Sequence, residues 1–449
     1  MLPKLSRLLP RRGFAHGIHP PESKADTAAQ PIRQFPFAPL MIVPLLQHAG
    51  KAALPVVRAG QEVLRGELLA EPDGPLSVAM HAPASGRIEG IELAPSISGR
   101  MQPAIYLKPH PGSTQEAIEG PPCDVDTASP EQILRAIQWA GIVGLGGAAF
   151  PTHVKLKPPP DKPVDTLVIN GAECEPYLST DHRVMLEQPR DIFQGIRYLL
   201  KVSGARRALI GIEAHKADAA EVLRAQRPAG GEVGVELLPV KYPQGAEKML
   251  IKALLGRTVP AGGLPCDIGV LTVNVATCAE IGRLLPRGQG IQERVVTITG
   301  PGVRQRGNYR IPIGTPLRFA LEHVGVSEEL SMVFLGGPMM GQALASLDIP
   351  ITKGTSGFVA FTRAETGRPA VEYPCIHCGY CVQACPMNLN PCDLGRFALK
   401  ERFEEMADGL QLFDCFECGC CSFVCPSHIP LVQSFRVAKN AVRKKRAAP

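Results

Sequence analysis

The stretch that decides the C-terminal fold is a pair of cysteine motifs, CIHCGYCVQACP at 375–386 and CFECGCCSFVCP at 415–426. Each has the spacing C-x2-C-x2-C-x3-C followed by proline. Three thiolates three residues apart on a tight turn can hold three corners of an iron–sulfur cubane, and the proline suits the first turn of a following helix. In two-cluster ferredoxins the fourth cysteine of each motif ligates the other cluster. The spacing therefore predicts an α-helical ferredoxin-type domain over 366–435 with two [4Fe–4S] clusters.

The crossed pattern assigns each cluster three cysteines of one motif and the last cysteine of the other. The first cluster is predicted to use Cys375, Cys378, Cys381 and Cys425, and the second Cys385, Cys415, Cys418 and Cys421. A zinc site would more typically use two separated pairs of ligands, and disulfides would call for a signal peptide that the sequence does not show. The other six cysteines are expected to pack or to be incidental; they are Cys123, Cys174, Cys266, Cys278, Cys392 and Cys420.

The composition is that of a globular chain of several domains with basic ends. At roughly 150 residues a domain, 449 residues allow about three domains. Part of the net charge of +6 lies in an N-terminal arm, 1–35, and a basic tail, 436–449. No RNA-binding aromatic pattern accompanies the charge, so no nucleic acid is expected. The uncharged stretch between Arg135 and Lys155 is rich in glycine and a poor membrane helix, so attachment to a membrane should be peripheral. The first residues lack a secretory apolar stretch, although a transit peptide stays open.

Residues 36–112 alternate apolar and polar residues between Gly and Pro breaks, which predicts short strands and turns. The pattern resembles the barrel-sandwich hybrid of biotinyl and lipoyl carrier domains. Those carriers need a lysine at a hairpin tip, and no lysine lies between Lys51 and Lys108. A swinging-arm function is therefore excluded, and a structural or docking role remains.

Residues 128–288 alternate predicted helices and strands, which favours an α/β domain. After a helix at 130–141 comes the glycine loop GLGGAAFPTHVKL, 144–156. It fits G-x-G-x-x-A only formally, because a dinucleotide fingerprint must follow a strand. We interpret it as a loop whose backbone lies against a phosphate or a flat ring, with Lys155 adding positive charge. A plain tight loop is the alternative.

A buried strand at 164–170 ends in NGAECEP, which places Asn170, Glu173 and Glu175 where open α/β sheets bind ligands. These side chains could accept hydrogen bonds from ribose or ribityl hydroxyls, although a solvated turn is the alternative. Further elements are expected as helices at 190–201 and 215–226, a helix from about Gln244, and a strand-to-helix turn through TVNVATCAE. From 290 to 365 a β-grasp-like module is predicted, with a helix capped by Thr315.

Taken together, the motifs resemble the C subunit of Rnf-type ion-translocating electron transport complexes along essentially the whole chain. The matching pieces are GIHPPE (17–22), HAPASG (81–86), the glycine loop, NGAECEP, YPQGAEK (242–248), TVNVATCAE (272–280) and the two cysteine motifs. The central domain also looks like the flavin-bearing, NADH-oxidising subunit of respiratory complex I. The resemblance implies an oxidoreductase and translocase subunit that holds FMN and two [4Fe–4S] clusters, uses NAD(H), and sits on the cytoplasmic side of a bacterial inner membrane with partner subunits.

The complex I resemblance also implies site residues. Its glycine loop, GRGGAGFPTGxK, matches Gly144, Gly146, Gly147 and Lys155, while Leu145 and Ala149 depart from it. Its other segments imply Asn170 and Glu173 at the flavin, Glu175, Tyr242 and Glu247 near the nicotinamide, and Asn274 and Thr277 in the remaining flavin-binding element. Ala172 stands where that family has aspartate. The three departures should affect nucleotide affinity more than flavin binding.

Three functions remain open on the sequence. The first is the redox subunit of a membrane ion pump, in which hydride passes between NAD(H) and FMN and single electrons pass to the clusters. The second is a soluble flavin and iron–sulfur reductase, such as a microcompartment cobalamin reductase. The third is a flavin-free scaffold that carries a dicluster relay. The order of modules, with GIHPPE and the barrel-sandwich before the flavin domain, favours the first.

Overall fold

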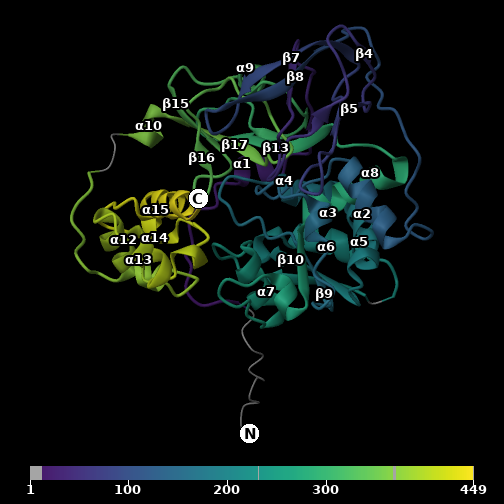
Figure 1. Ribbon diagram of the computed structural model, residues 1–449. Coiled ribbons are helices and arrows are strands. Elements are labelled where there is room, and N and C mark those ends of the chain that lie inside the picture. The colour runs from purple at the N-terminus through teal and green to yellow at the C-terminus, as the bar shows by residue number, and fades with distance from the viewer. Residues whose placement is uncertain (1–12, 231, 368–370, 448–449) are drawn as a thin grey trace.

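The computed structural model describes residues 13–230, 232–367 and 371–447. Figure 1 shows two β-rich units packed side by side above a central α/β unit, with a helical C-terminal unit beside them. Four basic residues of the N-terminal arm lie outside the described residues, namely Lys4, Arg7, Arg11 and Arg12. Within the described residues, no helix is long and apolar enough to span a bilayer.

The first β-rich unit consists of two small antiparallel sheets, as the alternating pattern predicts. One sheet has the order β2-β8-β7-β4 and the other β3-β5-β6. Buried and exposed residues alternate over much of β7, so one face packs on the core while the other meets solvent. The strand bounds are β2 Met41–Pro44, β3 Leu54–Pro55, β4 Glu62–Val63, β5 Leu68–Glu71, β6 Met80–His81, β7 Gly86–Pro95 and β8 Met101–Pro109.

The central unit contains a four-stranded parallel sheet of order β11-β10-β9-β12. Its strands are almost continuous apolar runs, as expected for strands with helices on both faces. The strands are β9 Thr166–Asn170, β10 Arg207–Glu213, β11 Val233–Leu238 and β12 Val270–Asn274; the helices are α2 Pro130–Trp139, α3 Thr152–Lys155, α4 Thr180–Glu187, α5 Pro189–Ser203, α6 Ala217–Gln226, α7 Glu247–Leu255 and α8 Val275–Leu284. The predicted helices are confirmed, except that α7 begins at Glu247 rather than near Gln244, because a turn occupies the residues between.

The second β-rich unit is a mixed six-stranded sheet of order β1-β14-β13-β17-β15-β16 with helix α9 packed on it. Its elements are β1 Arg33–Gln34, β13 Glu293–Thr299, β14 Gly307–Pro312, α9 Leu317–Val324, β15 Leu330–Leu335, β16 Gln342–Ala343, β17 Gly357–Thr362 and α10 Arg363–Thr366. The predicted cap of α9 is wrong. Pro316 occupies the N-cap position, and the Thr315 hydroxyl instead donates 2.7 Å to the carbonyl of Pro312.

The C-terminal unit is helical, as predicted, and its core contains Leu394, Met406, Leu412 and Phe435. Its helices are α11 Tyr380–Ala384, α12 Pro391–Leu399, α13 Phe403–Asp408, α14 Cys420–Phe423 and α15 Leu431–Ala447. The predicted basic tail is largely the end of α15. There Arg446 pairs with Glu404 and Asp408 on α13, so the charges partly serve the fold.

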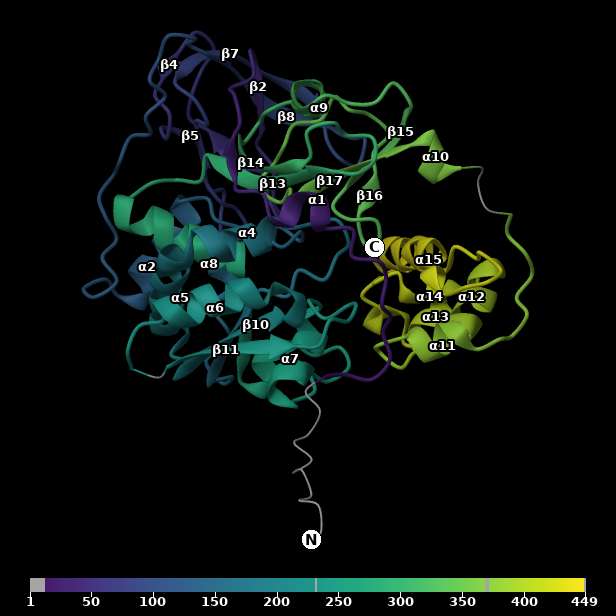
Figure 2. The same ribbon diagram turned by 180° about the vertical axis from the view of Figure 1, so that it is seen from behind.

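The N-terminal arm, residues 13–34, joins three of these units. Gly17 N–H donates 3.2 Å to the carbonyl of Ala384 in the helical unit, and Ile18 forms a β-bridge with Tyr242 of the central unit. After helix α1 Ala25–Ala28, strand β1 completes the edge of the mixed sheet. Figure 2 shows this purple segment passing between the central and helical units. The arm is therefore a built-in connector.

Candidate functional site

The carboxyl ends of β9 and β12 meet at one edge of the parallel sheet. From β9 the chain adds β10 and then β11 on one side, and β12 returns to the other side of β9. The strand order thus reverses between β9 and β12, and ligands of open α/β sheets bind outside the strand ends at such a point. Asn170 and Asn274 end these two strands and are direct register partners. Both predicted flavin-site asparagines therefore lie at the switch point.

The glycine loop lies against the N-terminus of α8. The Leu145 N–H donates 2.8 Å to the hydroxyl of Thr277, and a Cβ on Gly146 would lie 3.2 Å from the side-chain nitrogen of Asn274. Backbone groups of the loop and the positive N-terminal end of helix α8 are thereby gathered in one place. Such a combination suits a phosphate or another anion.

The loop is open on one side and braced on the other. At Gly147 φ is +116°, and an added Cβ would meet no atom of the described residues within 4 Å. On the braced side, the buried guanidinium of Arg294 donates 3.0 Å to the carbonyl of Leu145 and 3.2 Å to that of Thr355. Burial lowers the pKa of Arg294 to about 10. The open face at Gly147 is where the backbone could approach a ligand closely.

Asn274 is a helix cap as well as a site residue. Its side-chain oxygen accepts hydrogen bonds from the N–H groups of Ala276 and Thr277, at 3.0 and 3.2 Å, and its nitrogen donates 2.7 Å to Asp181. Burial raises the pKa of Asp181 to about 7, and the charge of Glu173 acts in the same direction. The site thus contains a carboxyl group that can hold a proton near neutral pH.

Lys155 carries its charge into an ion pair. Its ammonium lies 3.0 Å from Glu247 and 3.0 Å from the hydroxyl of Thr272. Asn170 donates 2.8 Å to the carbonyl of Gly245. These contacts bring together the glycine loop's helix, the end of β9 and the start of α7, which lie far apart in the sequence. The positive charge expected to face a phosphate is shared with a carboxylate.

Glu173 holds the first turn of α4. Its carboxylate accepts hydrogen bonds from the N–H groups of Asp181 and His182, at 2.7 and 3.1 Å. A carboxylate is favourable at a helix N-terminus. The backbone of Glu173 has φ of +45°, a strained value for a residue other than glycine. The turn after β9 is therefore held in one conformation by its own side chain.

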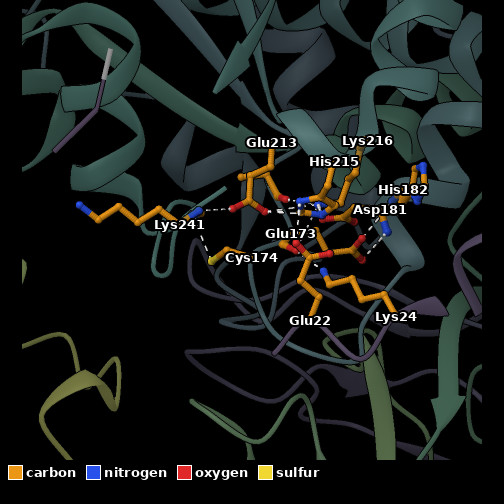
Figure 3. Close-up of polar contacts among 12 residues, drawn as sticks. Glu22, Lys24, Glu173, Cys174, Asp181, His182, Glu213, His215, Lys216 and Lys241 are labelled. Carbon is orange, nitrogen blue, oxygen red and sulfur yellow. Dashed lines mark hydrogen bonds and ion pairs between the residues drawn. The ribbon is translucent and has the colours of Figure 1, made fainter. Parts of the chain in front are cut away.

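A buried pair of lysines fixes the same turn from behind (Figure 3). Lys216 is fully buried and donates 2.7 Å to the carbonyl of Ala172, while its ammonium lies 3.3 Å from Glu213. Lys24, from the N-terminal arm, donates to the carbonyl of Glu173. Burial lowers the pKa of Lys24 and raises that of Glu213. Two lysine ammonium groups thus hold the carbonyl groups of the turn that follows β9.

A cavity adjoins the lysine pair and is lined among others by Glu22, Cys174, His215 and Lys241. Burial and the nearby Lys216 lower the pKa of His215 to about 3, so this ring is neutral at physiological pH. Cys174 accepts a hydrogen bond of 3.2 Å from Gly245 N–H, and burial raises the pKa of its thiol to about 12. The cavity is lined by several ionisable side chains, and the thiol of its cysteine stays protonated at neutral pH.

Glu175 and Tyr242 face the neighbouring units. The Glu175 carboxylate accepts hydrogen bonds from Met339 and Met340 N–H, at 2.6 and 3.0 Å. Burial raises the pKa of Glu175, although these groups and the Tyr242 hydroxyl favour its charged form. The Tyr242 hydroxyl donates 2.7 Å to the carbonyl of Cys418 in the second cysteine motif. Glu175 thus joins the central site to the mixed-sheet unit, and Tyr242 joins it to the cysteine unit.

The cysteines of the two motifs gather in two groups that match the crossed assignment. One cavity is lined by the thiols of Cys375, Cys378, Cys381 and Cys425. It also contains Cys392, whose sulfur lies 3.8 Å from that of Cys375. Cys392, which is expected to pack, thus lines the cavity of the first group, whereas Cys420 is fully buried as expected.

The other group surrounds Cys415. Burial raises the pKa of Cys415 to about 11, and the thiols of Cys418 and Cys385 lie close enough to raise it further. Burial raises the pKa of Cys421, and the nearby thiols of Cys415, Cys418 and Cys385 act in the same direction. Cys385 comes from the first motif and the other three from the second, so the chain brings together the four predicted partners.

Sequence reasoning missed the residues that reach the site from distant segments and hold it by hydrogen bonds. Arg294, Lys24, Lys216 and Asp181 each come from a segment without a recognisable ligand spacing. Lys24 follows the GIHPPE segment by two residues, which is the one signal that could have pointed to it.

Comparison with protein-family models divides the chain into four matched parts. Residues 12–111 match the RnfC barrel sandwich hybrid domain, and 137–283 match the Nuo51 FMN-binding domain. Residues 295–343 match the SLBB domain, and 374–429 match a 4Fe–4S dicluster domain. The FMN-domain match includes the glycine loop and both switch-point asparagines.

Several curated proteins are similar along most of the chain. The C subunit of the proton-translocating ferredoxin:NAD+ oxidoreductase complex of Clostridium ljungdahlii is 41% identical, over 90% of this chain and 88% of that protein. The Na+-translocating counterpart of Acetobacterium woodii is 39% identical, over 96% and 98%. The C subunit of the ion-translocating oxidoreductase complex of Rhodobacter capsulatus is 39% identical, over 99% and 87%. The chain therefore belongs to the family of C subunits of ion-translocating oxidoreductase complexes.

Proposed function

We propose that this chain is the peripheral electron-transfer subunit of a membrane-bound complex that couples redox chemistry to ion translocation. Electrons would pass between NAD(H), FMN and two [4Fe–4S] clusters. The barrel-sandwich match precedes the FMN-domain match along the chain, which favours a complex subunit over the soluble reductase. The observation that carries the proposal is the hydrogen bond between Tyr242 and Cys418, since it joins the flavin-type site to the cysteine motifs.

The cysteine unit fits two cubane clusters rather than one. A [4Fe–4S] cluster takes four thiolates, and two groups of four thiols are present, each with three cysteines from one motif and one from the other. The first group consists of Cys375, Cys378, Cys381 and Cys425, and the second of Cys385, Cys415, Cys418 and Cys421. Because α11 and α14 pack together, the two clusters would lie close enough for electron hopping.

The switch point fits FMN. The open backbone face at Gly147 and the start of α8 would receive the phosphate, while Asn170 and Glu247 offer polar groups nearby. Gln244 is fully buried, yet neither side-chain polar atom has a hydrogen-bond partner among the described residues. An unsatisfied buried amide costs roughly 1–3 kcal/mol, which a polar ligand or water would relieve.

FMN, when bound, supplies the exchange between the two electrons of a hydride and the single electrons that clusters accept. The residues of this chain position it and control its surroundings. Arg294 and Thr277 fix the glycine loop, and the lysine pair fixes the turn after β9. Asp181 is able to hold a proton near neutral pH beside the loop.

NAD(H) and the partner subunits follow from the family. The Clostridium and Acetobacterium relatives are named as ferredoxin:NAD+ oxidoreductase subunits, so we infer NAD(H) as the substrate here, with Glu175, Tyr242 and Glu247 near the nicotinamide. We place the chain on the cytoplasmic side of a bacterial inner membrane, attached through those subunits.

Anaerobic reconstitution with iron, sulfide and FMN, followed by titration with NADH, tests the proposal. We expect about eight irons per chain, one FMN, bleaching of the flavin by NADH, and magnetic coupling between the reduced clusters. Eight irons without flavin or an NADH response would leave only a dicluster relay. Two uncoupled signals would contradict the crossed ligation.

A further inference from the structure

The cavity of the first cysteine group holds more thiols than one cluster needs. Four of them belong to the crossed assignment, and the fifth is Cys392. Its sulfur lies 3.8 Å from that of Cys375, and the His377 ring nitrogen Nδ1 lies 4.0 Å from it. A thiol at this distance is within reach of an iron bound to Cys375.

The first turn of α12 fixes the position of Cys392. The Asn390 side chain caps the helix by accepting 3.2 Å from Asp393 N–H, and Pro391 occupies the first helical position. Cys392 follows at the second position of this helix, directly after the proline. The Cys392 sulfur is thus held at the cavity wall by a capped helix rather than by a loose loop.

Two other uses of this thiol fit less well. Cys375, His377 and Cys392 could together face a metal ion, since their ligand atoms lie within 4.8 Å of one another. A structural zinc site takes four ligands, however, and this one would remove Cys375 from the cluster. A disulfide between Cys375 and Cys392 would need an oxidant that the structure does not hold.

We propose that Cys392 is a reserve ligand that can replace Cys375 at the first cluster. This inference rests on the proposed function, because it presupposes a cluster in this cavity. In the exchange, the Cys392 sulfur forms a bond to iron and releases its proton, while the Cys375–iron bond breaks and the Cys375 sulfur takes up a proton. No electron is transferred. Cys375 is exposed in the structure, so solvent can reach this ligand. A substitute ligand would protect the cluster when Cys375 is lost.

Four full-length proteins test the proposal after anaerobic reconstitution with iron and sulfide: the unchanged chain, Cys375→Ala, Cys375→Ala/Cys392→Ala and Cys378→Ala. The readouts are iron and sulfide per chain and the EPR spectrum of the reduced protein. We expect Cys375→Ala to keep about eight irons with an altered [4Fe–4S] signal, and the double variant to lose roughly half of them or more. Cys378→Ala is the matched control for losing an exposed ligand of the same group.

Loss of iron from Cys375→Ala to the extent seen in Cys378→Ala would overturn the proposal. Equal retention in Cys375→Ala and the double variant would overturn it as well, because Cys392 would then contribute nothing. Both results leave the proposed function intact as long as the unchanged chain holds about eight irons. If the unchanged chain itself holds no cluster, the proposed function fails together with the inference.

Discussion

The cysteine unit and the central α/β unit hold their binding residues in opposite ways. In the cysteine unit, the thiols of Cys375 and Cys378 are exposed at the wall of a cavity, and their main neighbours are other thiols. In the central unit, the binding residues already bond to the protein: Asn274 caps α8, Glu173 holds α4, and Lys155 pairs with Glu247.

The difference separates two ways of building a redox site. Metal ligands whose neighbours are other ligands make folding depend on the metal, because binding free energy is then folding free energy. A site whose residues cap helices and pair charges can fold before its ligand arrives. We therefore expect the clusters to be structural for residues 371–447, and FMN to be a guest in a finished domain.

The largest effect should follow removal of the clusters. Cys421→Ala should cost the second cluster, about four irons, and expose the 371–447 region to proteases, because Cys421 also packs in that core. Cys278→Ala, a buried cysteine of the central unit, should leave the iron content unchanged. Circular dichroism and limited proteolysis measure this loss of structure. The comparison is the unchanged chain reconstituted without FMN, which should keep its native protection. If the cysteine unit without iron were as resistant to proteases as the native unit, the contrast between the two units would not hold.

The next effect concerns the buried lysine pair behind the flavin site. Lys216→Met removes the ammonium partner of the buried Glu213 carboxylate, and breaking such a buried pair typically costs about 3–5 kcal/mol. Urea unfolding can be followed by Trp139, the single tryptophan, which lies in α2 of the central unit. Lys248→Met removes only a surface hydrogen bond to the Pro260 carbonyl and should change the free energy of unfolding by less than about 0.5 kcal/mol. If the two variants had the same free energy of unfolding, the buried lysine contacts would not stabilise the central unit as we infer.

A smaller effect should separate two glycines of the same loop. Gly147→Ala places a side chain at φ of +116° on the open face, so we expect FMN to bind at least about tenfold more weakly, a loss of ~1.4 kcal/mol. Gly144→Ala adds a Cβ 3.6 Å from the Phe150 carbonyl, an ordinary contact, and should change affinity by no more than about twofold. Flavin fluorescence titration measures both, and indistinguishable affinities would argue against FMN at this face.

The smallest effect lies at the junction of the two units. Tyr242→Phe removes the hydrogen bond to the Cys418 carbonyl, worth about 1 kcal/mol, so iron should leave to a chelator roughly fivefold faster. Tyr198→Phe is the matched control, because the Tyr198 hydroxyl also donates to a backbone carbonyl, that of Cys123, but within the central unit and its adjoining loop. Equal iron release from both variants would show that the junction does not hold the cysteine unit in place.

Sequence reasoning succeeded where a spacing or a period expresses the physics. The two cysteine motifs predicted which thiols would meet, and apolar runs such as 164–170 predicted the parallel strands. The glycine loop and the ends of β9 and β12 were expected to form one site, and the structure brings Gly146, Asn274 and Thr277 together. The proposed domain boundaries stay predictions.

The remainder could not be predicted, because it depends on contacts between distant segments. Lys24 reaches Glu173 only after the arm has packed on the central unit, and Arg294 reaches Leu145 only after the mixed sheet has done so. Cys392 follows the first motif at no ligand spacing, and only the start of α12 brings it to the cavity. The cap of α9 was misplaced by one residue, since Thr315 bonds backward to Pro312 and leaves Pro316 as the cap.

The N-terminal arm has a consequence for the order in which the chain is made. Residues 13–34 are synthesised before their partners, which include Asn308 in the mixed sheet and Ala384 in the cysteine unit. During translation the arm can dock only as each partner is made, so Lys24 reaches its burial site only once the central unit exists. Completion of the fold waits for the cysteine unit, and a ribosome that stalls before the first cysteine motif leaves the arm without its contact to Ala384.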